Sequence, residues 1–138
     1  MRTRYATVKD KRVLIDTSVW IAYFRNDDAG LCQRVADLLS SVEVCVPKVV
    51  IAELMQGART EKELAALEEF AEAFTIIDQT EMSWLQAGRL AYSLKRKGSA
   101  VNLVDCYIAV LAKENRCNIL SLDVHFKQIQ RVFPIELL

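Results

Sequence analysis

The sequence predicts an α/β protein with a mostly parallel central sheet that is covered by helices on both faces. Short apolar runs such as RVLID and VEVCV are typical of buried strands, and segments with helical spacing separate them. Strands that alternate with helices favour a parallel sheet, because each helix returns the chain to the same edge. No repeat, linker or low-complexity stretch interrupts the sequence, so we expect one domain over residues 1–138.

The first four elements alternate strand and helix. Residues 12–16 (RVLID) predict a strand, and a helix follows from Thr17 to Phe24, because Asp, Thr and Ser favour helix N-termini. Residues 31–41 have apolar residues on one helical face, and residues 42–46 (VEVCV) predict the second strand.

The middle of the chain predicts two more helices. Pro47 suits the first turn of a helix that continues to about Ala58. Residues 61–74 form an acidic amphipathic helix, and TIID at residues 75–78 is either a short strand or an extended connector. Asp78 and Glu81 resemble a capping box, which opens a long helix.

The long helix should end at Lys97, because Gly98 suits the position just after a helix. Three further elements complete the chain. These are a helix over residues 102–115, a strand at 118–122 and a last strand at 133–138.

Composition excludes some classes of protein and leaves others open. Lys plus Arg equal Asp plus Glu at 18 each, so the net charge argues neither for nor against a nucleic-acid partner. Basic residues near the start (Arg2, Arg4, Lys9, Lys11 and Arg12) could contact phosphate or simply be solvated. No stretch reaches the roughly 18 apolar residues of a membrane helix, so no membrane partner is expected. No cysteine pair has C-x-x-C spacing, and a reducing cytoplasm is the simplest setting.

Four carboxylates stand in unusually apolar surroundings: Asp16, Glu53, Asp105 and Asp123. Asp16 and Asp123 follow strands, at the edge where open α/β sheets place their sites. Glu53 and Asp105 lie on helices that could lean over that edge. If the four converge, two carboxylates about 5 Å apart repel by about 3 kcal/mol, so the cluster needs a cation or protons.

Such a cluster favours hard cations, because oxygen ligands select Mg²⁺ or Mn²⁺ over Zn²⁺. A carboxylate-bound Mg²⁺ keeps waters that can attack a phosphodiester. The alternative is structural: Asp16 and Asp123 could cap the elements that follow them, and Asp105 could pair with Asn102 at a helix start. Glu53 has no such role in the middle of a helix.

Four segments together resemble the PIN domain family, in particular its VapC-type toxins. LIDTSVWI resembles the first motif, with Asp16 as a metal ligand and Thr17 or Ser18 as polar helpers. VVIAELMQGA resembles the second motif and LVDCYIAVLA the third. LSLDVHF resembles the last, with the Ser121 hydroxyl upstream of its aspartate. The motifs occur in the family order and cover nearly the whole chain.

The resemblance implies a three-layer α/β/α fold and an Mg²⁺- or Mn²⁺-dependent endoribonuclease. Asp16, Glu53, Asp105 and Asp123 would then be both the metal ligands and the catalytic residues. It also implies an RNA substrate, products with a 5′-phosphate and a 3′-hydroxyl, a homodimer, and an antitoxin whose tail blocks the acidic groove. The toxin would act in the cytoplasm.

Other functions remain as alternatives. A receiver domain would show paired acids after the first strand, and a haloacid-dehalogenase-type phosphatase needs a second Asp at position 18, which is Ser18. A housekeeping PIN nuclease, or a PIN-like module that binds RNA or protein without cutting, is harder to separate from a toxin. His125, the only histidine, has no identifiable general-base partner, so we expect a structural role for it.

Overall fold

The sheet at the centre of the computed structural model, which describes residues 11–138, contains four parallel strands. Their order across the sheet is β3-β2-β1-β4. The strands are β1 (Arg12–Ile15), β2 (Glu43–Pro47), β3 (Thr75–Ile77) and β4 (Asn118–Leu120). Every pairing is parallel, so the carboxyl ends of the strands lie at one edge. The prediction of a parallel α/β fold is confirmed.

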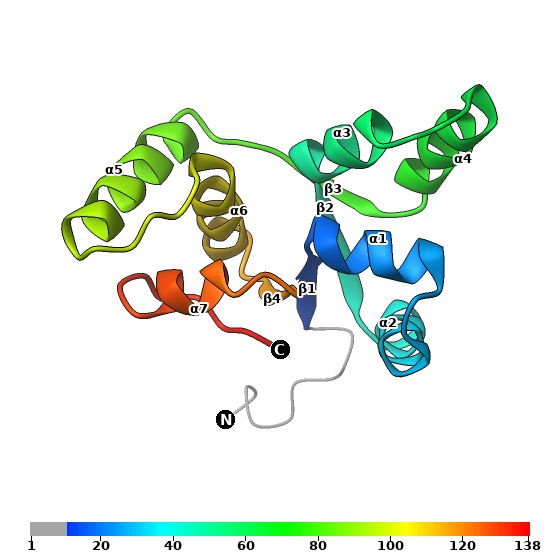
Figure 1. The fold of residues 1–138 in the computed structure, drawn as a ribbon, viewed down its shortest axis with the longest axis horizontal. Helices are drawn as coiled ribbons and strands as arrows, with labels where there is room; N and C mark the ends of the chain where they lie inside the picture. The colour runs from blue at the N-terminus through cyan, green and yellow to red at the C-terminus, as the bar shows by residue number, and fades with distance from the viewer. Residues whose placement is uncertain (1–10) are drawn as a thin grey trace.

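Seven helices in this described part of the chain connect the strands and cover them. They are α1 (Thr17–Arg25), α2 (Ala29–Ser41), α3 (Lys48–Gln56), α4 (Glu61–Glu72), α5 (Ser83–Arg96), α6 (Leu103–Glu114) and α7 (His125–Gln130). Figure 1 shows α5, α6 and α7 on one side of the sheet and α1, α2 and α4 on the other. This arrangement is the expected three-layer α/β/α fold.

Helix α6 is the most deeply buried helix among the described residues and positions part of the site. Every residue from 105 to 112 is buried, because the helix packs between α5, α7 and β4. A helix that is apolar on all sides belongs in the interior of a protein. Its one buried charged side chain, Asp105, lies in the first turn and is therefore held by the packing of the whole helix.

An aromatic cluster joins α1 to the end of α4. Trp20 is fully buried, and its ring centroid lies 4.8 Å from that of Phe70 in an edge-on contact and 5.5 Å from that of Phe74. Phe24 stacks on Trp20 but remains 46% exposed. The cluster is therefore core on one side and surface on the other.

The predicted capping box of Asp78 and Glu81 is wrong. Helix α5 begins at Ser83, where Thr80 N–H donates to Ser83 Oγ over 2.8 Å. Asp78 instead accepts from the N–H of Gln79 and pairs with Lys48 on α3, so a tertiary contact takes the side chain away from the helix. The end of α5 agrees with the prediction, since Gly98 has the left-handed φ of +85° that glycine tolerates.

The ends of two other predicted elements also differ. Pro47 is the last residue of β2 and the N-cap of α3, one position before the helix. The last strand, predicted over 133–138, reduces to one parallel bridge between Ile119 and Leu137. Helix α7 was not predicted, although Phe126 and Ile129 anchor it in the core.

Two further observations concern the helices and the cysteines. No helix within residues 11–138 is long and apolar enough to cross a membrane. The cysteines at positions 32, 45, 106 and 117 are all free thiols.

Candidate functional site

Asp16 connects β1 to α1 and is 5% exposed. Its Oδ2 accepts hydrogen bonds from Ser18 Oγ at 2.9 Å and from Ser121 Oγ at 2.8 Å. The side chain accepts no hydrogen bond from a backbone N–H in the first turn of α1, whereas a capping aspartate would accept one there. The interpretation of Asp16 as only a helix cap is therefore wrong.

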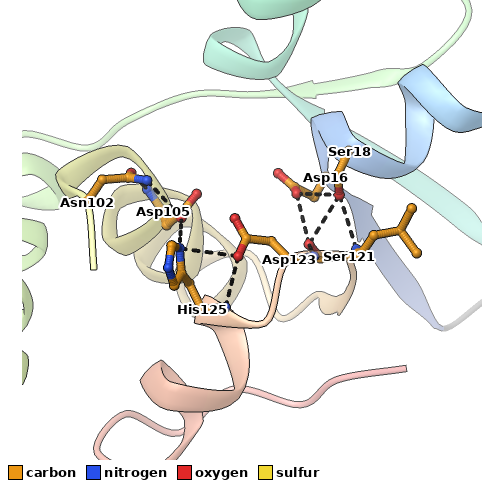
Figure 2. Close-up of polar contacts among 8 residues, drawn as sticks. Asp16, Ser18, Asn102, Asp105, Ser121, Asp123 and His125 are labelled. Atoms are coloured by element: carbon orange, nitrogen blue, oxygen red, sulfur yellow. Dashed lines mark hydrogen bonds and ion pairs between the residues drawn. The ribbon is translucent and has the colours of Figure 1, made fainter. Parts of the chain in front are cut away.

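The two serines hold the strand ends together around this carboxylate. Ser18 Oγ accepts a hydrogen bond from the N–H of Leu122 at 3.1 Å, and Ser121 Oγ accepts one from the N–H of Asp123 at 2.9 Å. Figure 2 shows this network between the end of β1 and the loop after β4. The serines orient Asp16 and the loop that carries Asp123, and they occupy only Oδ2 of Asp16.

Asp105 is 8% exposed and has two roles. Its N–H donates to Asn102 Oδ1 at 2.8 Å, and Asn102 Nδ2 donates to its Oδ2 at 3.0 Å, so the predicted pairing at the helix start is confirmed. Burial, followed by the negative charges of Asp123 and Asp16, raises the pKa of Asp105 to about 6, although His125 lowers it. Asp105 therefore pairs with the N-cap Asn102 and also faces the other aspartates.

Asp123 and His125 complete this group. Asp123 Oδ1 accepts the His125 N–H at 2.9 Å, so Asp123 also serves a local structural role. His125 Nδ1 lies 3.2 Å from Asp123 Oδ1 and 3.3 Å from Asp105 Oδ2. One ligand atom from each of the three residues lies within 4.8 Å of the other two. Figure 2 shows the imidazole between the two carboxylates.

The sequence offers no identifiable partner for His125, whereas the structure places Asp105 and Asp123 beside its Nδ1. The position of His125 in the sequence gives one indication of this contact, because it stands two residues after Asp123, where the next element would begin. Using that indication required the prediction of α7, which begins at His125 and was not predicted.

Glu53 lies apart from this group. It is exposed on α3, and Thr17 Oγ1 donates a hydrogen bond to its Oε1 at 2.8 Å. It lines a hollow of about 570 Å³ between α1, α3 and α4. Among residues 11–138, the structure therefore brings together Asp16, Asp105 and Asp123, with Glu53 linked to the start of α1 through Thr17.

The electrostatics of the group favour a positive ligand. Asp105 and Asp123 approach within 4.8 Å, where two ionised carboxylates repel by about 3 kcal/mol at an effective dielectric constant of about 20. The hydroxyl and amide donors around them carry no full charge. A divalent cation or a bound proton would relieve the repulsion. The raised pKa of Asp105, caused first by burial and then by the charge of Asp123, means that this carboxylate binds a proton more readily than a free one.

Arg12, one of the basic residues near the chain start, makes contacts away from this site. Arg12 donates to Glu43 Oε1 at 3.0 Å and to the Asn115 carbonyl at 2.7 Å, so its guanidinium has a structural role. Arg2, Arg4 and Lys9 lie outside the described residues.

Comparison with known families decides the classification. The family model described as the PIN domain matches residues 13–132, which is most of the chain. The chain belongs to the PIN domain family. The matched region of this PIN domain contains all four of the carboxylates singled out from the sequence.

Similar proteins of known name match nearly the full length of this PIN domain. Ribonuclease VapC1 of Haemophilus influenzae (strain R2866) is 26% identical over 132 residues, which cover 89% of this chain and 93% of the relative. Ribonuclease VapC19 of Mycobacterium tuberculosis (strain ATCC 25618 / H37Rv) is 30% identical over 122 residues, or 88% and 97% of the two chains.

A solved structure has the same fold. VapBC2 from Rickettsia felis, bound to a DNA fragment from its promoter, superposes with a TM-score of 0.75 at 19% identity. The match covers 92% of this chain and 97% of the solved one.

Proposed function

We propose that this PIN domain is a metal-dependent endoribonuclease and the toxin of a type II toxin–antitoxin pair. The observation that carries the proposal is the meeting of Asp16, Asp105 and Asp123 at the carboxyl edge of the sheet, where Asp105 has a pKa of about 6. The names of the relatives, which are VapC ribonucleases, support the class of reaction. Residues 1–138 would form one nuclease domain.

The donor set suits a hard divalent cation. Carboxylate oxygens are the ligands that Mg²⁺ and Mn²⁺ prefer, and the group has more negative charge than its neutral hydrogen-bond donors can balance. Asp16, Asp105 and Asp123 would hold Mg²⁺ or Mn²⁺. Glu53 would contribute from the adjoining rim, where Thr17 orients its carboxylate.

Neighbouring polar side chains orient the aspartates that would bind the metal. Ser18 and Ser121 direct Asp16, and Asn102 directs Asp105. A divalent cation bound here would lower the pKa of a coordinated water and neutralise charge on the phosphodiester. We propose cleavage that leaves a 5′-phosphate and a 3′-hydroxyl, with the four acids Asp16, Glu53, Asp105 and Asp123 as the catalytic residues.

The antitoxin partner would bind in the hollow between α1, α3 and α4. Solved structures with this fold are VapBC toxin–antitoxin complexes, which supports a protein partner. The lining combines an apolar floor with charges of both signs, and it includes Glu53. The floor contains Ile21, Leu54, Leu67 and Phe70, and the charges are Arg25, Asp27, Arg59 and Glu63. A segment placed here could reach Glu53 and hinder RNA.

We also propose a homodimer that forms through the outer face of α5. Leu85 is 66% exposed and Tyr92 is 63% exposed, seven residues apart and therefore on one side of the helix. Gly88 lies between them, with open space where a side chain would be. Large exposed apolar residues that gather on one helix face are typical of contact surfaces.

The alternatives are a housekeeping PIN nuclease and a PIN-like binding module without activity. The grouped aspartates favour catalysis over binding alone, since repulsion between them costs stability that a binding module need not sacrifice. The four free thiols agree with a cytoplasmic site of action.

Cleavage of RNA by the purified chain tests the proposal. With Mg²⁺ or Mn²⁺ the protein should cut structured RNAs, and EDTA or Asp105→Asn should abolish cutting, whereas the exposed Glu69→Gln on α4 should leave it intact. Expression without a partner should arrest growth, and Asp16→Asn should relieve the arrest. Cutting that survives both EDTA and Asp105→Asn would exclude the metal mechanism, and harmless expression of an active wild type would favour a housekeeping nuclease.

A further inference from the structure

His125 occupies a position in the acidic group that its neighbours on α7 fix. Phe126 is 1% exposed and Ile129 is fully buried, so the helix is anchored beside the aspartates. The side chain of His125 is 36% exposed, and its Nδ1 faces Asp105 and Asp123. The packing of α7 therefore places the imidazole beside the two carboxylates, as expected of a preorganised functional side chain.

The donor atoms have the spacing of adjacent metal ligands. His125 Nδ1 lies 3.2 Å from Asp123 Oδ1 and 3.3 Å from Asp105 Oδ2. Neighbouring ligands in an octahedron with metal–oxygen distances of about 2.1 Å are about 3 Å apart. The imidazole needs little movement to share a cation with both carboxylates. The same distances also allow an ion pair that only holds the aspartates in place.

We propose that His125 is a nitrogen ligand of the divalent cation, beside Asp105 and Asp123, and that it shifts the preference of the site from Mg²⁺ towards Mn²⁺. The inference rests on the proposed metal-dependent function. Mg²⁺ favours oxygen ligands and gains little from nitrogen, whereas Mn²⁺ is the softer of the two ions and accepts an imidazole nitrogen more readily. A site with three carboxylates and one imidazole therefore discriminates between the two ions more strongly than a site of carboxylates alone.

The single histidine of this chain makes a direct test possible. The full chain, without a polyhistidine tag, is loaded with Mn²⁺ alone and studied by electron spin-echo envelope modulation. Wild type should show coupling of Mn²⁺ to an imidazole nitrogen, and labelling with ¹⁵N-histidine should change that coupling. His125→Gln should lack it. Bound Mn²⁺ without histidine coupling in wild type would overturn the inference and leave His125 as a positioning residue.

Binding titrations with Mn²⁺ and Mg²⁺ test the selectivity. His125→Gln should weaken Mn²⁺ binding by roughly tenfold or more and change Mg²⁺ binding much less. Lys127→Gln, which removes a charge from the exposed side of the same helix, is the matched control and should alter neither. Equal loss of both ions in His125→Gln would contradict the selectivity. If wild type binds neither ion while the fold is intact, the proposed function itself fails.

Discussion

Ser121 Oγ donates a hydrogen bond to Asp16 Oδ2 over 2.8 Å, and this bond joins the ends of β1 and β4 across 105 residues of sequence. The two strands are neighbours in the sheet, and the Asp16 N–H also donates to the Leu120 carbonyl at 3.0 Å. Parallel pairing therefore brings Asp16 and Asp123 to the same edge of the sheet. Ser121 orients the Asp16 carboxylate and also fixes the backbone of Asp123.

Ser121→Ala should reduce RNA cleavage strongly and the stability of the fold only modestly. The change removes a donor to the buried Asp16 and an acceptor for the Asp123 N–H, which should lower the free energy of unfolding by about 1–2 kcal/mol. RNA cleavage should fall by roughly tenfold or more, because a supporting bond to a metal ligand is lost. Ser40→Ala, which removes a serine bond on α2, is the control. Equal activity of the two variants would contradict a supporting role for Ser121.

Asp105→Asn should stabilise the metal-free protein in a pH-dependent way. The pKa of Asp105 is raised from 3.8 to about 6 in the folded state, so the wild type loses stability as pH rises through this window. Asparagine has no such penalty. In EDTA the variant should melt above wild type at neutral pH, by up to about 3 kcal/mol of unfolding free energy, and the difference should vanish near pH 4.

Excess Mn²⁺ should reverse that order, because binding to the native state raises the melting temperature of wild type by mass action. Thermal melts of both proteins over this pH range, with EDTA and with Mn²⁺, measure the two effects. A variant that is less stable than wild type in EDTA at neutral pH would contradict the cost of ionising the buried Asp105.

Glu53→Gln separates function from stability. Glu53 is exposed, and its bond from Thr17 can be kept by the glutamine oxygen, so the melting temperature in EDTA should change little. RNA cleavage and the Mn²⁺-dependent rise in melting temperature should both decrease. The exposed Glu69→Gln on α4 tests whether any lost surface charge has this effect. Full activity of Glu53→Gln would remove Glu53 from the catalytic residues.

The sequence indicated the three aspartates because each follows a strong local pattern. Asp16 and Asp123 end apolar strands, and Asp105 begins an apolar helix whose Asn102 cap is itself a recognisable signal. Strand order then brings them together. Glu53 was recognised by its apolar neighbours, of which Val50 and Leu54 are buried, whereas Glu53 itself is exposed and lies at the hollow beside Thr17.

Other features could not be read from local patterns. The spacing of Asp78 and Glu81 suits a capping box, but Lys48 on a distant helix pairs with Asp78 at 3.0 Å. Helix α7 has only six residues, and its N-cap is Val124, which gives no capping signal. The contact of His125 with two aspartates depends on that helix and on α6, and therefore required the tertiary structure.

Leu85→Glu should dissociate the proposed homodimer. A charge at this exposed position would be desolvated in an interface on the outer face of α5, whereas it is solvated in the monomer. Sedimentation equilibrium should show a dimer for wild type and a monomer for the variant. The monomeric variant should still unfold in one cooperative transition, which shows that the fold is intact. Gln86→Glu adds the same charge to the next residue of α5 and should affect association less. A wild type that is monomeric at every concentration would contradict the dimer.

Ala66→Arg should block antitoxin binding without harm to the nuclease. Ala66 is exposed on α4 and lines the hollow beside Glu53, whereas the neighbouring Ala65 is exposed but does not line it. A long cationic side chain at position 66 would fill space that a bound segment needs, while the aspartates are untouched. Co-purification with the protein encoded beside it should therefore be lost for Ala66→Arg and kept for Ala65→Arg. Both variants should cut RNA as wild type does when alone, but only Ala65→Arg should be inhibited by that protein. Inhibition of both would place the antitoxin elsewhere on the surface.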